Sequence, residues 1–210
     1  DGTVPGALYE PETPLDRGTK ITLIVDHKTL SEIEVIIDEA RKHLLRDCRY
    51  VEKPIYFNGE RITQDFDLDA PVKVRFGKKG IEGVIGLVPS NKSFYEVYNN
   101  RIRLEGDTNN LADTLGKEDG LFSIKKTGIY FGLAIRVSSK YLNYDIARSK
   151  VVRDGNFEGI VGVLEDQEEA LAKEAFAVIE GIAQRGYKDS EAEHVSLQFI
   201  QNYLFRKIKK

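Results

Sequence analysis

The sequence contains no methionine and no tryptophan, and it has a single cysteine, Cys48. One cysteine cannot form a disulfide within the chain, so we expect the reducing environment of the cytoplasm. The three histidines, His27, His43 and His194, lack a cysteine partner at the spacing of a zinc site, and we expect no metal site. The chain begins with Asp-Gly rather than with methionine, from which we expect a piece of a longer protein.

Long apolar runs and an excess of basic residues are also missing. No run approaches the roughly 18 apolar residues of a membrane-spanning helix, so we expect no membrane partner. Lysine and arginine total 31 against 34 aspartate and glutamate, a net charge of -3, whereas nucleic-acid-binding proteins usually carry a basic excess. A nucleic-acid partner is therefore not expected. The 210 residues, 41% of them hydrophobic, suffice for one large domain or two modest ones.

The periodicity of the apolar residues predicts a mixed α+β chain. In the first part of the chain we expect a β-branched strand (20–26) and then a helix from Leu30 to about Arg46 behind a Thr29–Glu32 capping box. A strand (53–57) with a hairpin turn at Asn58-Gly59 follows, and then a strand (71–76). The second part predicts a strand pair (94–104) that turns at Asn99-Asn100, a polar surface loop (106–120), a strand pair (123–138) that turns near Gly128 or Gly132, and helices Asp166–Arg185, ended by Gly186, and Ser190–Lys210.

Glycines recur at every third position between these two parts, at Gly77, Gly80, Gly83 and Gly86. This spacing invites comparison with a phosphate-binding loop, but no Gly-Lys-Ser/Thr ends the run and no helix follows at once. We therefore interpret these glycines as places where a strand bends or is crowded by a neighbour.

The segment YLNYDIARSKVVRD (141–154) contains the main candidate for chemistry. Arg148 and Arg153 flank a short apolar step after a predicted strand, where they could bind an anion or form a solvated surface edge. For Arg148, the surface alternative is an ion pair with Asp145 or Asp154. For Arg153, the solvated interpretation is preferred.

Several stretches resemble the ninety-kilodalton heat-shock chaperones, which belong to the GHKL group together with gyrase, MutL and histidine kinases. RGTKITLIVD (17–26), the capped helix behind it and YVEKPIYFNGERI (50–62) resemble the last third of the ATPase domain of that family. IEGVIGLVPS (81–90) and LNYDIARSKVVRD (142–154) resemble its middle, or transducer, segment. The resemblance covers most of the chain.

This resemblance implies a fold and a division of the chain. Residues 1–76 would be the C-terminal part of a GHKL ATPase sandwich, and residues 77–210 would be a transducer-type αβ domain with C-terminal helices. Gly18 and Thr19 would open the final core strand beside the nucleotide. Arg148 would take the place of the arginine that reaches across to the terminal phosphate of ATP.

The resemblance also implies a cofactor and partners. In the family, a metal-binding asparagine helix, an adenine pocket with an aspartate and glycine-rich lid segments hold the nucleotide, and residues 1–16 do not contain them. ATP and its Mg would therefore be bound mainly by other parts of the parent protein, and this chain alone would be inactive as an ATPase. The partners would be client proteins or co-chaperones, and the parent protein would be a homodimeric stress-response chaperone.

Two positions depart from the family pattern. The family usually has an acidic residue directly after the arginine and a long polar residue four positions on, where this chain has Ser149 and Val152. The transducer of another GHKL ATPase, such as a phage protein or a nucleic-acid-acting machine, therefore stays open as an alternative.

A non-enzymatic interaction module and a small independent enzyme are further alternatives. An interaction module could use aromatic residues of the predicted strands to stack on nucleic-acid bases, namely Phe94, Tyr95, Tyr98, Tyr130 and Phe131. The alternation of the strands favours packing of these residues in the core. For an enzyme, Cys48 has no catalytic signature around it and is better interpreted as a structural thiol. We rank the chaperone transducer first, the transducer of another GHKL machine second and the independent enzyme last.

Overall fold

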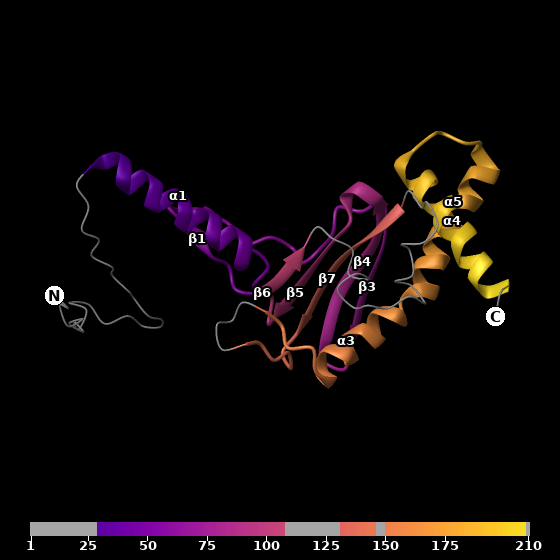
Figure 1. Ribbon diagram of the computed structural model, residues 1–210. Helices are drawn as coiled ribbons and strands as arrows, with labels where there is room; N and C mark the ends of the chain where they lie inside the picture. Colours follow the sequence, from indigo (N-terminus) through magenta and orange to yellow (C-terminus); the bar gives the residue numbers. More distant parts are fainter. Residues whose placement is uncertain (1–28, 108–130, 146–149, 209–210) are drawn as a thin grey trace. The chain divides into compact units, whose positions relative to one another are not determined.

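The computed structural model describes residues 29–107, 131–145 and 150–208 (Figure 1). The chain divides into two compact units, Asp1–Asp38 and Glu39–Lys210. The sheets lie in the second unit together with the C-terminal helices. The fold is α+β, as the sequence predicts.

Helix α1, Leu30–Asp47, begins where the sequence predicts a helix start. The backbone N–H of Thr29 donates to Oε2 of Glu32 (2.9 Å), and the backbone N–H of Glu32 donates to Oγ1 of Thr29 (3.3 Å). This reciprocal capping box satisfies two of the amides that a helix start leaves without an intrahelical acceptor. The strand predicted over residues 20–26 lies outside the described residues.

A two-stranded hairpin follows α1 in the sequence. β1 (Tyr56–Phe57) pairs antiparallel with β2 (Glu60–Arg61). Asn58 and Gly59 form the turn with φ angles of 49° and 83°, in the left-handed region that asparagine and glycine tolerate best. The predicted Asn-Gly hairpin is confirmed, with shorter strands than expected.

A five-stranded sheet is the main element of the second unit. Its strands are β3 (Val72–Lys78), β4 (Ile81–Pro89), β5 (Phe94–Asn99), β6 (Ile102–Asp107) and β7 (Phe131–Ser139), with the 3-10 turn η1 (Ser90–Lys92) between β4 and β5. They stand in the order β3-β4-β7-β5-β6. The pair β5 and β7 runs parallel, and the other neighbouring pairs run antiparallel. The predicted hairpin over residues 94–104 is confirmed as β5 and β6, with its turn at Asn100-Arg101, one residue later than predicted.

Glycines in the sheet mark close approaches between neighbours. A Cβ atom on Gly83 would lie 2.4 Å from the ring of Phe76, and one on Gly86 would lie 2.6 Å from Cβ of Ala70. The interpretation of these two glycines as crowded strand positions is therefore confirmed. Gly80, with a φ angle of 77°, lies instead in the turn between β3 and β4.

Strand β7 runs without interruption through Gly132, so the turn predicted near this residue is wrong. Gly132 pairs with Val88 of β4. A Cβ atom on Gly132 would lie 1.6 Å from Oγ of Ser93, so the glycine permits a close approach and not a reversal of the chain. The alternative turn at Gly128 lies outside the described residues.

The division that the sequence suggests between residues 76 and 77 falls inside β3. β3 pairs with β4 from Val72 opposite Leu87 to Lys78 opposite Ile81, so both sides of that position belong to one sheet. The boundary is corrected accordingly, because the glycine-rich stretch forms a hairpin turn within the sheet. The compact units divide instead after residue 38.

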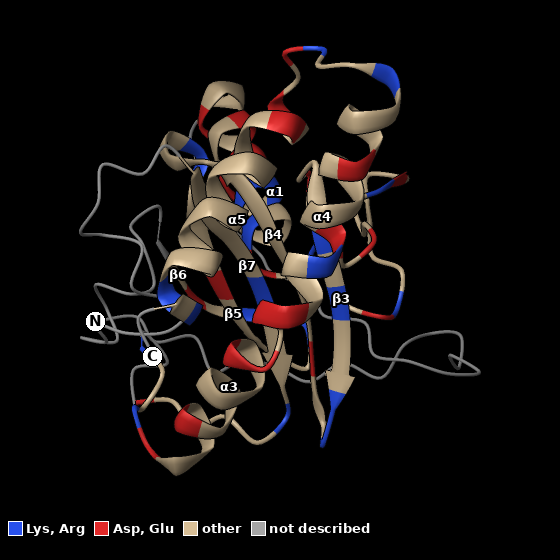
Figure 2. Ribbon diagram, turned by 90° about the vertical axis from the view of Figure 1, so that its right-hand side faces the viewer, with Lys and Arg blue, Asp and Glu red and all other residues tan. Residues whose placement is uncertain are grey.

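Helices α3 (Gly155–Glu165), α4 (Glu168–Arg185) and α5 (Glu191–Ile208) cover one face of the sheet (Figure 2). The core between them is built from apolar side chains of both layers, among them Ile85, Leu87, Ile135, Ile160, Leu164, Leu171 and Phe199. None of the helices in the described ranges combines the length and apolar character needed to cross a bilayer.

The sequence predicts α4 and α5 but not α3. Gly186, with a φ angle of 81°, ends α4 as predicted. The missed signal for α3 is the N-cap Asp154 followed by apolar residues at helical spacing, of which Phe157, Ile160 and Leu164 are buried.

The opposite face of the sheet carries a second, aromatic cluster. Tyr50, Phe66 and Tyr98 pack edge to face, with ring centroids 5.3 to 5.7 Å apart. Tyr95 and Phe131 are buried as well, so the prediction that the strand aromatics pack in the core is confirmed for these described residues. Tyr130 lies outside them.

Candidate functional site

The site residues predicted from the resemblance, Gly18, Thr19 and Arg148, lie outside the residues that the structure describes. The structure does describe the residues on both sides of Arg148, 141–145 and 150–154, and these form a defined frame. A second feature, which the sequence did not predict, is a group of arginines on the face of the sheet opposite the helices.

The frame around residues 146–149 is closed by backbone hydrogen bonds. Tyr144 and Val151 form an antiparallel bridge. The N–H of Asp145 donates to the carbonyl of Lys150 (3.0 Å), and the N–H of Val152 donates to the carbonyl of Asn143 (2.9 Å). The two chain segments that flank Arg148 are therefore held against each other.

This frame is attached both to the sheet and to helix α3. The N–H of Val151 donates to Oε2 of Glu105 on β6 (3.1 Å). Oδ1 of Asp154 accepts the N–H groups of Asn156 (3.0 Å) and Phe157 (3.2 Å) at the start of α3, and its Oδ2 accepts Nδ2 of Asn143 (2.7 Å). These hydrogen bonds, that from Asn143 foremost, hold the pKa of Asp154 below its ordinary value.

Arg153 is not simply a solvated surface residue. Its guanidinium forms an ion pair with Glu105 and lies 4.0 Å from the centre of the Phe157 ring. About a third of its side chain is exposed (35%). Glu105 also accepts the hydroxyl of Tyr95 (2.9 Å), so Arg153 belongs to the contacts that join the frame to the sheet and α3.

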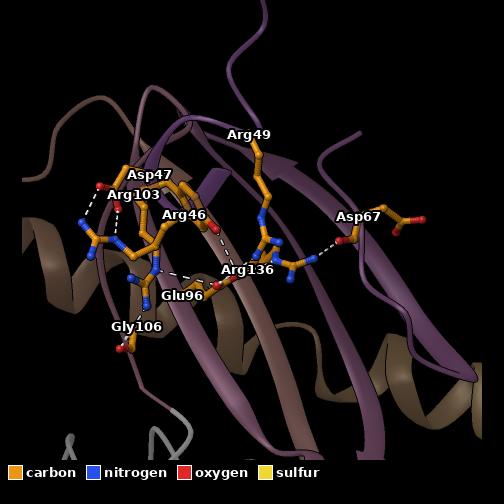
Figure 3. Close-up of polar contacts among 9 residues, drawn as sticks. Arg46, Asp47, Arg49, Asp67, Glu96, Arg103, Gly106 and Arg136 are labelled. Atoms are coloured by element: carbon orange, nitrogen blue, oxygen red, sulfur yellow. Dashed lines mark hydrogen bonds and ion pairs between the residues drawn. The ribbon is translucent and has the colours of Figure 1, made fainter. Parts of the chain in front are cut away.

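Three arginines converge on one carboxylate on the other face of the sheet, as Figure 3 shows. Nε of Arg136, on β7, lies 2.5 Å from Oε2 of Glu96, on β5. Nη2 of Arg49 and Nε of Arg103 lie 3.6 and 3.7 Å from Oε1 of the same carboxylate. Arg136 also donates to the backbone carbonyl of Asp67. We call Arg49, Arg103, Arg136 and Glu96 the guanidinium cluster.

Arg136 stays ionised in this cluster although it is largely buried. Glu96 and Arg136 are each only 13% exposed. Burial by itself would lower the pKa of Arg136, but its hydrogen bond to Glu96 and the charge of that carboxylate outweigh burial, and the pKa is raised. The hydroxyl of Tyr98 donates to Glu96 (2.9 Å), and burial first and Glu96 second raise its pKa, so it stays a donor.

A pocket of about 320 Å³ opens beside the guanidinium cluster. Arg103 and Arg136 line it together with other hydrogen-bond donors and two aromatic residues, namely Asn91, Lys92, Ser93, Phe94 and Tyr95. Glu96 is the acidic residue among the described residues that line it. Its lining therefore comes from η1 and from three neighbouring strands, with cations in excess.

A larger, open hollow of about 760 Å³ lies at the end of the sheet where two hairpins turn. Its rim carries mostly exposed cations, Lys53, Lys78, Lys79, Arg101 and Lys140, and the carboxylates Glu52 and Glu82. Nε and Nη2 of Arg101 bind both oxygens of Glu82 (2.7 and 2.8 Å), and this contact lowers the pKa of Glu82. The rest of this rim has the character of a solvated basic edge.

Metal and thiol chemistry receive no support from the described part of the chain. No group of three His, Cys, Asp or Glu residues within it could hold a metal ion. Cys48 is half-buried, and burial first and the charge of Asp47 second raise the pKa of its thiol. A thiol with a raised pKa is a poor nucleophile at neutral pH, in agreement with the structural interpretation.

The guanidinium cluster had a weak signal in the sequence. Arg103 stands between Ile102 and Leu104, and Arg136 stands between Ile135 and Val137, so each is a charged residue with apolar residues on both sides. Such residues mark a partner or a site. The sequence could not show that both meet the same carboxylate.

Comparison with known proteins adds no family. No protein-family model matches the chain, and no curated protein sequence matches it.

Proposed function

We propose that this chain is part of an ATP-dependent chaperone of the ninety-kilodalton heat-shock type, in which it passes nucleotide state from the ATPase domain to the rest of the protein. In this proposal Arg148 contacts the terminal phosphate of ATP held by other parts of the parent protein. Gly18 and Thr19 stand beside the nucleotide. The parent is a cytoplasmic homodimer whose partners are client proteins or co-chaperones.

The observation that carries the proposal is the closed frame on both sides of Arg148. An arginine that stabilises charge on a transferred phosphoryl group has to be delivered at a defined place. The bridge between Tyr144 and Val151 and the cap that Asp154 forms on α3 hold the two flanking segments. These anchors fix the described residues on either side of Arg148, which supports its proposed role as a delivered contact.

The α+β fold and the sequence resemblance support the same proposal. A sheet covered on one face by C-terminal helices agrees with a transducer-type domain. The sheet and helices also provide a rigid base, because the frame is bonded to Glu105 on β6 and to the start of α3.

Substitution of Arg148 in the full-length parent protein tests the proposal. Arg148→Ala should slow ATP turnover by about tenfold to a hundredfold, because the contact is made mainly in the reacting state. The affinity for ATP should stay nearly unchanged. Single-turnover kinetics and nucleotide titration of the same preparation measure the two quantities separately.

Lys150→Ala is the matched control, because Lys150 is an exposed cation two positions away. Its loss should change turnover by less than about threefold, since exposed charges contribute little. If both variants slow turnover equally, or if Arg148→Ala weakens ATP binding as much as it slows turnover, the phosphate contact is wrong.

Another GHKL machine, of phage origin or acting on nucleic acid, is the second candidate. The basic rim of the 760 Å³ hollow favours this candidate, because Lys53, Lys79 and Lys140 would bind the phosphates of a nucleic acid there. The net charge of -3 opposes it. Salt-dependent binding of double-stranded DNA by the chain would move this candidate to first place.

A further inference from the structure

The guanidinium cluster holds more positive charge than the described carboxylates neutralise. Arg49, Arg103 and Arg136 contribute three positive charges and Glu96 one negative charge, which leaves two positive charges. The carboxylate of Asp67 is bound by Lys73 (2.7 Å) and Arg75 (3.0 Å), and the contact of Asp67 with Arg136 is made by its backbone carbonyl.

Two guanidinium N–H groups in the cluster are also buried beyond hydrogen-bonding distance of a described acceptor, although Nε of Arg103 lies 3.7 Å from Oε1 of Glu96. Within the described ranges, Nε of Arg49 and Nε of Arg103 have no hydrogen-bond partner. A buried charged donor without an acceptor costs free energy, so such groups are normally satisfied. Excess charge and unsatisfied donors thus occur in the same few side chains, and of these Arg103 and Arg136 line the adjacent pocket, where an anion would offset the charge.

The pocket beside the cluster provides room for that anion. Arg103 and Arg136 line it, and Ser93, Asn91 and Lys92 add neutral and charged donors from the turn before β5. Lys92 also pairs with Glu191 (2.9 Å) at the start of α5. The donors therefore come from separate elements of the fold and surround a volume of about 320 Å³.

Gly106 shapes the wall beside Arg103. A Cβ atom on Gly106 would lie 2.5 Å from Nη2 of Arg103, and the same Nη2 donates to the carbonyl of Gly106 (3.2 Å). The glycine thus lets the guanidinium lie flat against β6. This contact, together with Glu96, sets the orientation of the planar group at the pocket.

We propose that this pocket binds a phosphate group, either free phosphate or the phosphate of a small organic ester. A phosphate carries about 1.5 to 2 negative charges at neutral pH and a carboxylate carries one, so a phosphate offsets more of the two excess positive charges. Arginine forks match the geometry of phosphate oxygens. Phe94, which also lines the pocket, supplies an apolar surface for an organic group.

This inference concerns the face of the sheet opposite the helices and does not depend on the proposed contact between Arg148 and ATP. The two can therefore fail separately. Glu96 competes with the anion for the same guanidinium groups, so changes to Glu96 and to Arg103 should affect binding in opposite directions.

Isothermal titration of the 210-residue chain at constant ionic strength tests the site. The probes are inorganic phosphate, phenyl phosphate and, as a monoanion, acetate. Both phosphates should bind in a saturable manner and acetate more weakly. Tighter binding of phenyl phosphate identifies an organic phosphate as the ligand, and equal binding identifies the phosphate group alone.

The variants distinguish a phosphate site from a purely structural cluster. Arg103→Gln should weaken phosphate binding by about tenfold to a hundredfold, the effect expected for a charge-assisted hydrogen bond. Glu96→Gln should strengthen binding, because it removes the competing carboxylate. Lys53→Gln, which removes an exposed cation outside this pocket, should leave binding within about twofold of the unchanged chain.

Thermal melting of each variant verifies that it is folded. If Arg103→Gln does not fold, Arg103→Lys takes its place. Lysine keeps the positive charge but lacks the planar guanidinium, so this variant should still weaken phosphate binding. The proposal is overturned if neither phosphate binds, if acetate binds as tightly as phosphate, or if the Arg103 and Glu96 variants change the affinity in the same direction.

Discussion

At the scale of single residues, Gly132 and Ser93 occupy one small space where β7 passes the turn before β5. Alanine at position 132 would place its Cβ 1.6 Å from Oγ of Ser93, 3.0 Å from Cβ of Ser93 and 3.3 Å from Cα of Ser90. Rotating the serine hydroxyl would relieve only the first of these contacts. The other two require the backbone to move.

Gly132→Ala should therefore lower the free energy of unfolding by about 1–3 kcal/mol, the usual cost of overpacking a rigid site. Gly159→Ala in α3 is the control, because a Cβ there would meet nothing within 4 Å. That change should raise the free energy of unfolding by about 0.5–1 kcal/mol, since alanine favours a helix over glycine. Urea denaturation measures both, and a shared direction of change would refute the crowding argument.

At the scale of elements, Glu193 connects α4 to α5 and is completely buried. Its carboxylate accepts Nη1 of Arg185 at the end of α4 (2.7 Å) and the backbone N–H of Lys188 (2.8 Å). It also completes a capping box, because it accepts the N–H of Ser190 (3.3 Å) while its own N–H donates to the Ser190 hydroxyl (3.3 Å). One side chain of α5 thus accepts hydrogen bonds from the end of α4 and from the turn between the two helices.

Burial by itself would raise the pKa of Glu193, but the hydrogen bonds from Arg185, Lys188 and Ser190 outweigh it and lower the pKa. A carboxylate with a lowered pKa in the folded state stabilises the fold above its unfolded-state pKa. That stability is lost as the pH falls through the folded-state value. The junction between α4 and α5 should therefore weaken in acid.

Glu193→Gln should lower the melting temperature by several degrees at neutral pH, because the amide loses the charge and one acceptor oxygen. The difference from the unchanged chain should shrink as the pH falls below the ordinary carboxylate range, where Glu193 becomes protonated. Glu174→Gln, at an exposed position of α4, is the control and should change little at any pH. A Glu193→Gln difference that stays constant with pH would count against the buried carboxylate.

At the scale of the whole molecule, the stability of the second unit should be independent of the first. Helix α1 buries none of its residues, whereas the main core is made from the five-stranded sheet and α3 to α5. Among the residues that the structure describes, most of the apolar burial that stabilises folding therefore lies within the second unit.

A chain shortened to residues 39–210 should consequently unfold cooperatively within about 2 °C of the full chain. A chain that ends at Arg185 is the counterpart, because it lacks the buried Val195, Phe199 and Ile200 of α5 and should not unfold cooperatively. Circular dichroism melts compare the two. A large loss of stability in the first shortened chain would show that residues 1–38 contribute to the fold.

Local structure could be predicted from the sequence because its causes are local. The Thr29–Glu32 capping box and the Asn58-Gly59 turn involve neighbours in the chain, and the start of α1 and the first hairpin lie where these signals place them. Glycine was ambiguous, because it serves both turns and close approaches. Gly132 was one of the two glycines near which the sequence predicts a turn, whereas its contact with Ser93 depends on how η1 packs against β7.

The sequence by itself determined the α+β class, the start of α1 and the Asn58-Gly59 hairpin, since hydrogen bonding within a few residues and apolar periodicity specify them. Tertiary structure alone decided the guanidinium cluster. Glu96 and Arg136 stand 40 positions apart and become opposite partners only because β5 and β7 pair in parallel, a pairing that no local signal announces. Arg49 and Arg103 then join the same carboxylate from two further segments. A charge excess of this kind arises from side chains that folding brings together, and the sequence shows its members only one at a time.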